Sequence, residues 1–216
     1  MIIFIPIKQN SQRVPKKNFR VFKNAPLYKH VLRKFNKHNV FVDTDSQEIL
    51  EECKKDKSLS HVNAFSREKH LLGDRTSVCK LIENFIEKFQ IIDPIVQTHV
   101  TSPFMDVKTL EDAYKFLTTH DSVVSCNVFN SRFWRKENYG YCPVNHNPLK
   151  LEQTQDLPKI YEENSAFYMF YPKVVKENKN RIGQNPYFYS VKHPLNIDID
   201  TELDWKLALK EVNNEN

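Results

Sequence analysis

Side chains that can bind phosphate gather directly after an apolar run at the start of the chain. The run is IIFIPI, residues 2–7. Side chains with suitable donors follow it: Lys8, Gln9, Asn10, Ser11, Arg13, Lys16 and Lys17. A buried strand that opens into such a loop is how α/β proteins hold phosphates at the carboxyl edge of a sheet. We therefore interpret residues 8–17 as a phosphate-binding loop; the alternative is a solvated basic loop.

The positive charge of the chain is concentrated in its first part. Residues 1–42 contain ten lysines and arginines and no aspartate or glutamate, although the formal net charge of the whole chain is only +5. No helix-turn-helix or zinc-finger pattern accompanies these cations, so a small phosphorylated ligand is favoured over nucleic acid. None of the three glycines lies in the loop, so neither a Walker loop nor a G-x-G-x-x-G fingerprint is present.

A pair of carboxylates near the end of the chain is the second candidate site. In NIDIDTELD (196–204), Asp198 and Asp200 alternate with two isoleucines. With the period of a β-strand, both carboxylates point to one face and the isoleucines point to the core. Paired carboxylates can bind Mg²⁺ that bridges to phosphates, and a triphosphate needs such a cation. The alternative is an exposed strand face or a cluster at a helix start.

The elements that must position these residues alternate between strand and helix. Strands are expected over 1–7, 40–43, 62–65, 94–100, 122–127, 166–171 and 187–191, and helices over 26–37, 46–55, 77–89, 107–118 and 201–212. Ser46 and Thr201 are the expected N-caps, with Asp204 completing a capping box. The alternation predicts a three-layer α/β/α fold with a mostly parallel sheet, and ligands over the carboxyl ends of its strands.

The alternation is interrupted over residues 129–158. This stretch contains three prolines and four aromatic residues between Phe133 and Pro158, too many aromatics for a solvated linker. We expect one domain over residues 1–216 in which 129–158 is an inserted excursion that forms a partner interface.

Composition limits the class of protein further. No window of about eighteen apolar residues exists, so no membrane partner is expected. The N-terminal run is too short for a signal peptide and lacks a preceding basic region. The four cysteines, Cys53, Cys79, Cys126 and Cys142, have no C-x-x-C spacing. They are typical of reduced thiols in a cytoplasmic protein.

Six segments carry a family resemblance. They are IKQNSQRVPKKN (7–18), VDTDSQEI (42–49), Arg67 with Asp74, VTSPF (100–104), QDLPKIYEENSAFYMF (155–170) and IDIDTELDW (197–205). The first is similar to the pattern A-R-(G/Q)-(G/N)-S-K-x-x-P-x-K-N, and the fifth to Q-x-L-P-x-x-(Y/F)-x-x-N-G-A-x-Y. On these segments the chain resembles the acylneuraminate cytidylyltransferases (CMP-sialic acid synthetases) and their relatives that act on other 3-deoxy-ulosonic acids.

The resemblance implies a reaction and a set of site residues. CMP is transferred from CTP to the anomeric hydroxyl of a 2-keto-3-deoxy sugar acid, and pyrophosphate is released. The nucleotide-binding residues are then Lys8, Asn10, Ser11, Arg13, Lys17, Asn18, Arg67, Thr76 and Ser77. The substrate-binding residues are His99, Thr101, Ser102, Arg135, Gln155 and Asn164. Asp198 and Asp200 hold Mg²⁺ and are catalytic together with Lys17. The resemblance also implies a homodimer formed by the excursion, with Arg135 reaching into the partner's site.

Several positions depart from the family pattern. Lys8 replaces an arginine and loses its bidentate fork, Gln12 replaces a lysine, and His99 stands where a glutamine is usual. An arginine that commonly precedes Q-x-L-P is missing. These changes cluster on the sugar side of the site, so they bear on the identity of the sugar more than on CTP. Two alternatives stay open: a nucleotide-binding protein with impaired catalysis, and a nucleotide-sugar pyrophosphorylase for another base or sugar.

Overall fold

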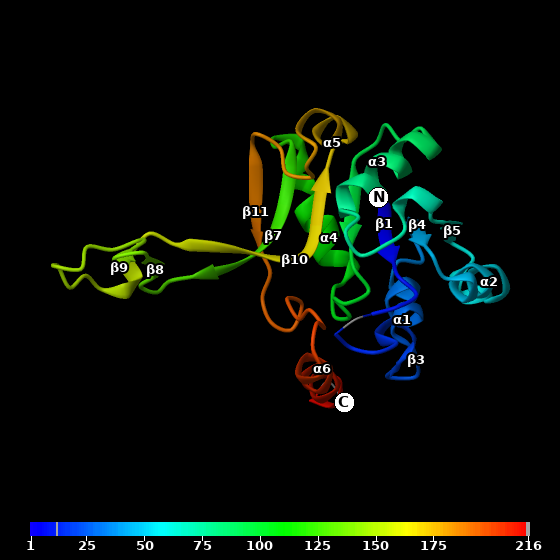
Figure 1. Ribbon diagram of the computed structural model, residues 1–216, viewed down its shortest axis with the longest axis horizontal. Helices are drawn as coiled ribbons and strands as arrows, with labels where there is room; N and C mark the ends of the chain where they lie inside the picture. The colour runs from blue at the N-terminus through cyan, green and yellow to red at the C-terminus, as the bar shows by residue number, and fades with distance from the viewer. Residues whose placement is uncertain (12, 215–216) are drawn as a thin grey trace.

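The structure, a computed structural model, describes residues 1–11 and 13–214. Among these residues a seven-stranded sheet has the order β11-β7-β10-β6-β1-β4-β5 (Figure 1). Its strands are β1 (Ile2–Ile7), β4 (Asn39–Thr44), β5 (Val62–Ser66), β6 (Ile95–Thr98), β7 (Ser122–Phe129), β10 (Ile160–Phe170) and β11 (Pro186–Ser190). All paired neighbours are parallel except that β10 runs antiparallel to both β6 and β7. The predicted mostly parallel sheet is confirmed.

Helices cover both faces of the sheet. They are α1 (Leu27–Lys34), α2 (Gln47–Lys55), α3 (Val78–Phe89), α4 (Val107–Tyr114), α5 (Pro172–Asn178) and α6 (Glu202–Asn214). One apolar cluster joins the sheet to α1, α2 and α4, and a second joins its other face to α3 and α5. In the second cluster Phe4 of β1 stacks on Phe85 of α3, with ring centroids 4.7 Å apart. The predicted three-layer α/β/α arrangement is therefore confirmed.

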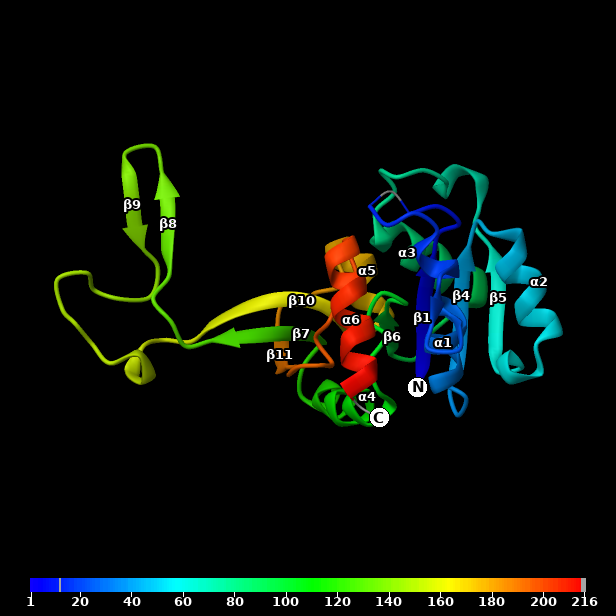
Figure 2. The same cartoon turned by 90° about the horizontal axis from the view of Figure 1, so that it is seen from below.

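A third apolar cluster attaches the C-terminal helix to the beginning of the chain. Trp205 of α6 packs against Phe22 of the short hairpin β2 (Val21–Phe22) and β3 (Ala25–Pro26). The guanidinium of Arg20 lies over the Trp205 ring, 4.3 Å from its centroid. Figure 2 shows α6 between the β10 side of the sheet and α1. This contact brings the segment before α6 next to the N-terminal loop.

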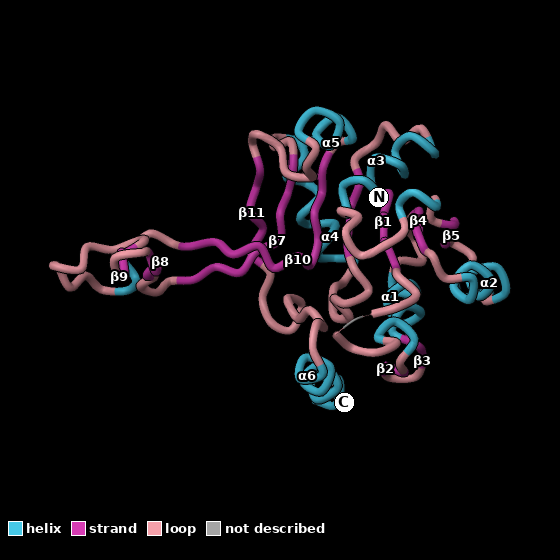
Figure 3. Tube along the Cα trace, viewed as in Figure 1, coloured by secondary structure: helices cyan, strands magenta, loops and turns pink. Residues whose placement is uncertain are grey.

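A long arm leaves the sheet between β7 and β10. Figure 3 shows both strands continuing from the sheet into the arm, which carries the hairpin β8 (Trp134–Glu137) and β9 (Gly140–Pro143) and a loop that extends beyond it. The register of β10 against β7 shifts between Glu163 and Tyr168, and Ser165 in this bulge has φ of 58°. That left-handed conformation favours glycine, which the family pattern has at this position.

Several local predictions are confirmed and others are wrong. Ser46 accepts a hydrogen bond from the Ile49 amide as the N-cap of α2, and Thr201 and Asp204 exchange the bonds of a capping box. The segment 196–200, for which a strand period was expected, forms no strand. Helix α5, which has Pro172 in its first turn, and the first half of β10 have no counterpart among the expected elements.

Two further observations concern the whole described chain. No helix in residues 1–11 and 13–214 is long and apolar enough to cross a membrane. The four cysteines are free thiols.

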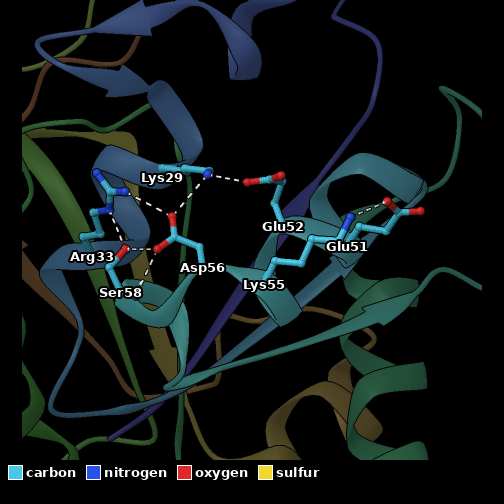
Figure 4. Close-up of polar contacts among 7 residues, drawn as sticks. All are labelled: Lys29, Arg33, Glu51, Glu52, Lys55, Asp56 and Ser58. Carbon is cyan, nitrogen blue, oxygen red and sulfur yellow. Dashed lines mark hydrogen bonds and ion pairs between the residues drawn. The ribbon is translucent and has the colours of Figure 1, made fainter.

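Helices α1 and α2 are joined by a cluster of charged side chains around Asp56 (Figure 4). The Oδ2 atom of Asp56 accepts from Lys29 and from Arg33, each at 3.1 Å, and its Oδ1 atom accepts from the Ser58 hydroxyl at 2.6 Å. Lys29 also contacts Glu52 at 2.5 Å. These bonds, the one from Ser58 first, hold the pKa of Asp56 well below its ordinary value.

Asp56→Asn is expected to lower the free energy of unfolding at pH 7 by about 1 kcal/mol, because the variant loses these charge-assisted bonds. A carboxyl group whose pKa is lower in the folded than in the unfolded state stabilises the fold at pH values above its pKa in the unfolded state, about 4. This stabilisation is lost as the pH falls from there through the pKa of the folded state. Urea unfolding of both proteins at pH 7, 5 and 3 tests this, and the difference between them should shrink below about pH 4. Glu51→Gln, which alters exposed contacts with Lys55 and Gln47 on α2, is the control. An equal difference at all three values would contradict the assignment.

Candidate active site

A cavity of about 360 Å³ opens at the carboxyl ends of β1 and β6. Three chain segments far apart in sequence line it: the loop after β1, the loop before α3, and the turn after β6. The lining residues are Pro6, Lys8, Asn10, Ser11, Arg13, Lys17, Asn18, Arg67, Asp74, Thr76, Val78, Leu81, His99, Val100 and Thr101. The cavity lies at the sheet edge where the phosphate-binding loop was expected.

Two buried side chains hold the N-terminal loop in place. Asn18 is 6% exposed, and its amide donates to the carbonyl of Lys8 at 2.8 Å across the loop. Lys17 is 9% exposed, and its Nζ atom donates to the carbonyl of Ile199 at 2.5 Å. Lys16 before them has φ of 53°, which lets the chain turn without a glycine. These contacts fix the two ends of the loop, at Lys8 and at Lys17–Asn18, without a ligand.

The N-terminal cations meet a C-terminal carboxylate. The Oδ1 atom of Asp200 lies 2.8 Å from Arg13 Nη2 and 3.5 Å from Lys17 Nζ. Next to it, Ile199 is fully buried in the α6 cluster, and its amide donates to the carbonyl of Thr101 at 2.8 Å. The segment thus keeps its isoleucines inward, although it forms no strand, and its backbone is anchored to the turn after β6.

Asp198 is the second carboxylate of this segment. Its side chain accepts a hydrogen bond from Thr101, a residue of the cavity wall. Burial, and next the negative charge of Asp200, raise the pKa of Asp198, while the Thr101 bond and the charge of Lys17 oppose that rise. A cation beside Asp198 would offset both its burial and the negative charge of Asp200.

The opposite rim of the cavity is formed by the loop before α3. Lys8 Nζ lies 3.3 Å from Asp74 Oδ1 and joins this loop to the N-terminal one. Thr76 lines the cavity beside it. Ser77 does not line the cavity; its hydroxyl oxygen accepts from the Lys80 amide as the N-cap of α3. Val78 and Leu81 at the start of α3 line the cavity next to Thr76.

Arg67 reaches the cavity floor from inside the protein. It is 5% exposed, and its Nε atom contacts Asp43 Oδ1 at 2.5 Å. Its Nη2 atom also donates to the carbonyls of Asp43 and Ile7 at 3.2 and 3.4 Å. The ion pair therefore joins the ends of β1, β4 and β5 under the site.

His99 lines the cavity at the end of β6. Its Nε2 atom lies 2.8 Å from the side-chain nitrogen of Gln97. Burial, and then the positive charges of Arg181 and Lys17, lower the pKa of His99 to about 4, against the opposing charge of Asp200. The imidazole is therefore neutral at physiological pH.

The structure gathers most of the predicted site residues but not all of them. Lys8, Asn10, Ser11, Arg13, Lys17, Asn18, Arg67, Thr76, His99 and Thr101 line one cavity, and Asp198 and Asp200 contact members of that set. Gln12 lies outside the described residues.

Besides Ser77, four predicted residues do not line the cavity of this single copy. Arg135 pairs with Glu137 on β8, and Gln155 contacts Gln153, both in the arm. Asn164 donates to Asn127 at the root of the arm, and Ser102 is buried at 1% exposure and does not line the cavity. Their roles in substrate binding stay predictions.

Sequence reasoning missed three polar residues near the cavity. Asp74 was recognised only as part of a motif, although it pairs with Lys8. Gln97 reads as an ordinary strand residue, and Arg181 lies in a loop after α5 with no motif around it. Only three-dimensional contacts distinguish the last two: Gln97 contacts His99, and Arg181 contacts Gln97.

The donor set fits Mg²⁺. Asp198 and Asp200 are carboxylates, the ligands that Mg²⁺ prefers, and it commonly takes only one or two from the protein with the rest from phosphates and water. The raised pKa of Asp198 is the observation that supports the fit, because a cation at that carboxylate would offset both burial and the charge of Asp200.

The fold is that of nucleotidyltransferases. A solved structure titled as CMP:2-keto-3-deoxy-manno-octonic acid synthetase complexed with CTP superimposes with a TM-score of 0.70 at 14% identity, covering 100% of this chain and 99% of that one. The sequence profile of the family described as "Cytidylyltransferase" matches residues 2–215. The chain belongs to the cytidylyltransferase family.

Individual relatives differ in length from this chain. N-acylneuraminate cytidylyltransferase A of Danio rerio is 28% identical over 212 residues, which cover 94% of this chain and 48% of the relative. The chain thus spans about half the length of that curated relative. CMP-N,N'-diacetyllegionaminic acid synthase of Legionella pneumophila is 28% identical, and the match covers 100% of this chain and 98% of the relative. Pseudaminic acid cytidylyltransferase of Campylobacter jejuni is 26% identical over 99% of this chain and 97% of the relative.

Asp43→Asn is expected to lower the free energy of unfolding by about 3 kcal/mol, because it leaves the Arg67 guanidinium buried without a counter-charge. Urea unfolding measures the loss. Removing both charges with Asp43→Asn and Arg67→Met should recover part of it. Glu68→Gln, which removes an exposed pair with Lys88, is the control. A loss below about 1 kcal/mol for Asp43→Asn would show that Arg67 does not depend on this partner.

Proposed function

We propose that the protein transfers CMP from CTP to the anomeric hydroxyl of a 2-keto-3-deoxy sugar acid, as its family membership implies. The observation that carries the proposal is the junction of Lys17 and Arg13 with Asp200 at one end of a cavity that Lys8 and Thr76 line. Cations for a triphosphate and carboxylates for a metal thus meet beside one cavity. The CTP bound to the synthetase with the same fold supports the choice of nucleotide for this family.

The transfer is a single displacement at phosphorus. The hydroxyl oxygen of the sugar acid forms a bond to the α-phosphorus as the bond from that phosphorus to the bridging oxygen of the β-phosphate breaks. Pyrophosphate leaves with the electron pair, and the hydroxyl proton passes to water. Such a reaction needs positioning and charge stabilisation more than covalent help from the protein.

Each end of the cavity has its own task in this proposal. Lys8, Ser11 and Asn18 hold the triphosphate, and Lys17 neutralises charge that develops on the transferred phosphoryl group. Thr76 and the apolar side chains of Val78 and Leu81 are placed for the nucleoside. Arg67 acts at the floor, where its position is set by Asp43.

Asp198 and Asp200 would hold Mg²⁺ together with phosphate oxygens. When bound, the ion would neutralise the leaving pyrophosphate and lower the pKa of the attacking hydroxyl. Because Asp200 already contacts Arg13 and Lys17, its position is fixed at the cationic loop before binding.

The acceptor is proposed to be a sialic acid or a related sugar acid. The relatives are named for N-acylneuraminate, pseudaminic acid and N,N'-diacetyllegionaminic acid. His99 and Thr101 line the cavity for this substrate, and Ser102 and Asn164 are further predicted contacts. His99 stands where a glutamine is usual, so this position bears on which sugar acid the protein uses.

A homodimer is proposed to complete the site. The arm exposes large apolar side chains: Tyr139 at 103%, Leu149 at 95% and Leu151 at 92% of their accessible area. Such surface in one segment marks an interaction site. Arg135 and Gln155 lie on this arm, away from the cavity of their own copy (Figure 1), so they can act only on a partner's site. A cytoplasmic location stays a prediction from cysteine spacing.

Incubation with CTP, Mg²⁺ and a panel of ulosonic acids is expected to release pyrophosphate. Asp200→Asn should lower kcat at least a hundredfold, because both the metal position and the anchor of Lys17 and Arg13 are lost. Asp112→Asn, which removes an exposed pair with Lys115, is the control. Thermal melting should show stabilisation by CTP but not by UTP or ATP.

The outcomes of this assay separate the alternatives. CTP binding without turnover on any acid would select the impaired nucleotide-binding protein. Stabilisation by another nucleotide would select a pyrophosphorylase of different base specificity. No binding of any nucleotide would overturn the proposed function.

The chain is expected to be a dimer at micromolar concentration in size-exclusion chromatography with light scattering. Leu149→Glu with Leu151→Glu should give a monomer, because charge replaces the exposed apolar surface of the arm. The activity of this double variant should also fall, because Arg135 and Gln155 no longer reach the site of a second copy. Ile92→Glu changes an exposed apolar residue outside the arm and is the control. A monomeric wild type would contradict the proposal.

A further inference from the structure

A chain of three polar side chains runs from the loop after α5 to the cavity. The guanidinium of Arg181 lies over the Tyr168 ring, 3.5 Å from its centroid, and its Nη1 atom donates to Gln97 Oε1 at 2.5 Å. The amide nitrogen of the same Gln97 lies 2.8 Å from His99 Nε2. Gln97 is fully buried on β6, and its amide connects the other two side chains.

The direction of every hydrogen bond in this chain follows from Arg181. A guanidinium has donors and no acceptor, so the Gln97 atom that it contacts must be the carbonyl oxygen. The other end of the amide is then the NH₂ group, which also donates to the Thr98 carbonyl at 3.3 Å. An NH₂ group that faces His99 Nε2 requires a lone pair there, so the imidazole proton lies on Nδ1.

We propose that Arg181 and Gln97 hold His99 as a neutral hydrogen-bond donor, with its Nδ1–H directed at an oxygen of the acceptor sugar acid in the cavity. This inference rests on the function proposed above. Arg181 and Gln97 are positioning residues, because they act through His99.

Two observations agree with this assignment. Among the residues that the structure describes, none binds the Nδ1 atom of His99, a residue of the cavity wall. The charged groups that act on the imidazole are Arg181, Lys17 and Asp200, and the two cations together with burial keep it neutral. His99 therefore offers the same kind of group, an N–H donor, as the glutamine that is usual at this position.

The arrangement also excludes a role for His99 as the general base. Its one lone pair is directed at Gln97, so no lone pair faces the attacking hydroxyl. The Nδ1–H group favours a sugar acid that presents an oxygen able to accept a hydrogen bond, such as a carboxylate, carbonyl or ether oxygen. It disfavours a sugar acid that presents there a group that can only donate.

Nitrogen-15 NMR of histidine-labelled, unliganded protein at pH 7.5 tests the tautomer directly. His99→Gln identifies the signals by their loss. The wild type should show a protonated Nδ1 and an unprotonated Nε2 at His99. Gln97→Glu presents only acceptors to the ring and should move the proton to Nε2, and Arg181→Met should give a mixture of tautomers. Lys179→Met, which removes a cation of the same loop paired with Glu83, should leave the wild-type pattern.

Kinetics tests the consequence for substrate binding. Gln97→Glu is expected to raise the KM for the acceptor about tenfold, the effect of one lost hydrogen bond, with little change in the KM for CTP. His99→Gln keeps a donor and should raise the acceptor KM less than His99→Ala.

A wild-type His99 with its proton on Nε2 would overturn the proposal. So would a Gln97→Glu variant in which only the KM for CTP rises. If the wild type turns over no acceptor, the proposed function fails. The NMR result then decides on its own whether Arg181 and Gln97 set the tautomer.

Discussion

The bond from the Lys17 ammonium to the Ile199 carbonyl is the contact on which the site depends. It joins residues 182 positions apart and holds a nearly buried cation 3.5 Å from the carboxylate of Asp200. Burial of such a group is costly unless it is paired, so this bond also fixes where the C-terminal segment must lie. The stacking of Arg20 on Trp205 and the α6 cluster hold the same two segments from the other side.

A second charge pair, that of Arg67 and Asp43, supports the floor of the cavity from inside the protein. The parallel strands β1, β4 and β5 end together, and the Arg67 guanidinium donates to the carbonyls of Ile7 on β1 and Asp43 on β4. Asp43 keeps that guanidinium in place. The polar side chains above this floor are thus supported by a charge pair that solvent does not reach, which makes the cavity a preorganised one.

The fold was predictable from the sequence where local pattern and burial agree. The Ile2–Ile7 run and the amphipathic period of Val78–Phe89 specify a strand and a helix whatever surrounds them. The loop of cations was predictable for the same reason, because it interrupts such a run. The segment 196–200 misled the strand prediction because its alternation is satisfied by α6, a tertiary partner, and not by a sheet. Arg181 and Gln97 carry no local signal, since their significance arises only from the side chains they meet.

The antiparallel placement of β10 has a consequence for how the protein can vary. The chain leaves the sheet along β7 and returns along β10, and these two strands are direct neighbours. Both ends of the arm therefore lie side by side at one place in the sheet. Adding or removing paired residues in these two strands changes the reach of the arm in steps of a few ångströms. Neither the sheet nor the Asp198 segment has to move. Insertions and deletions should therefore accumulate in the arm, and the span between two copies can change while the cavity stays the same.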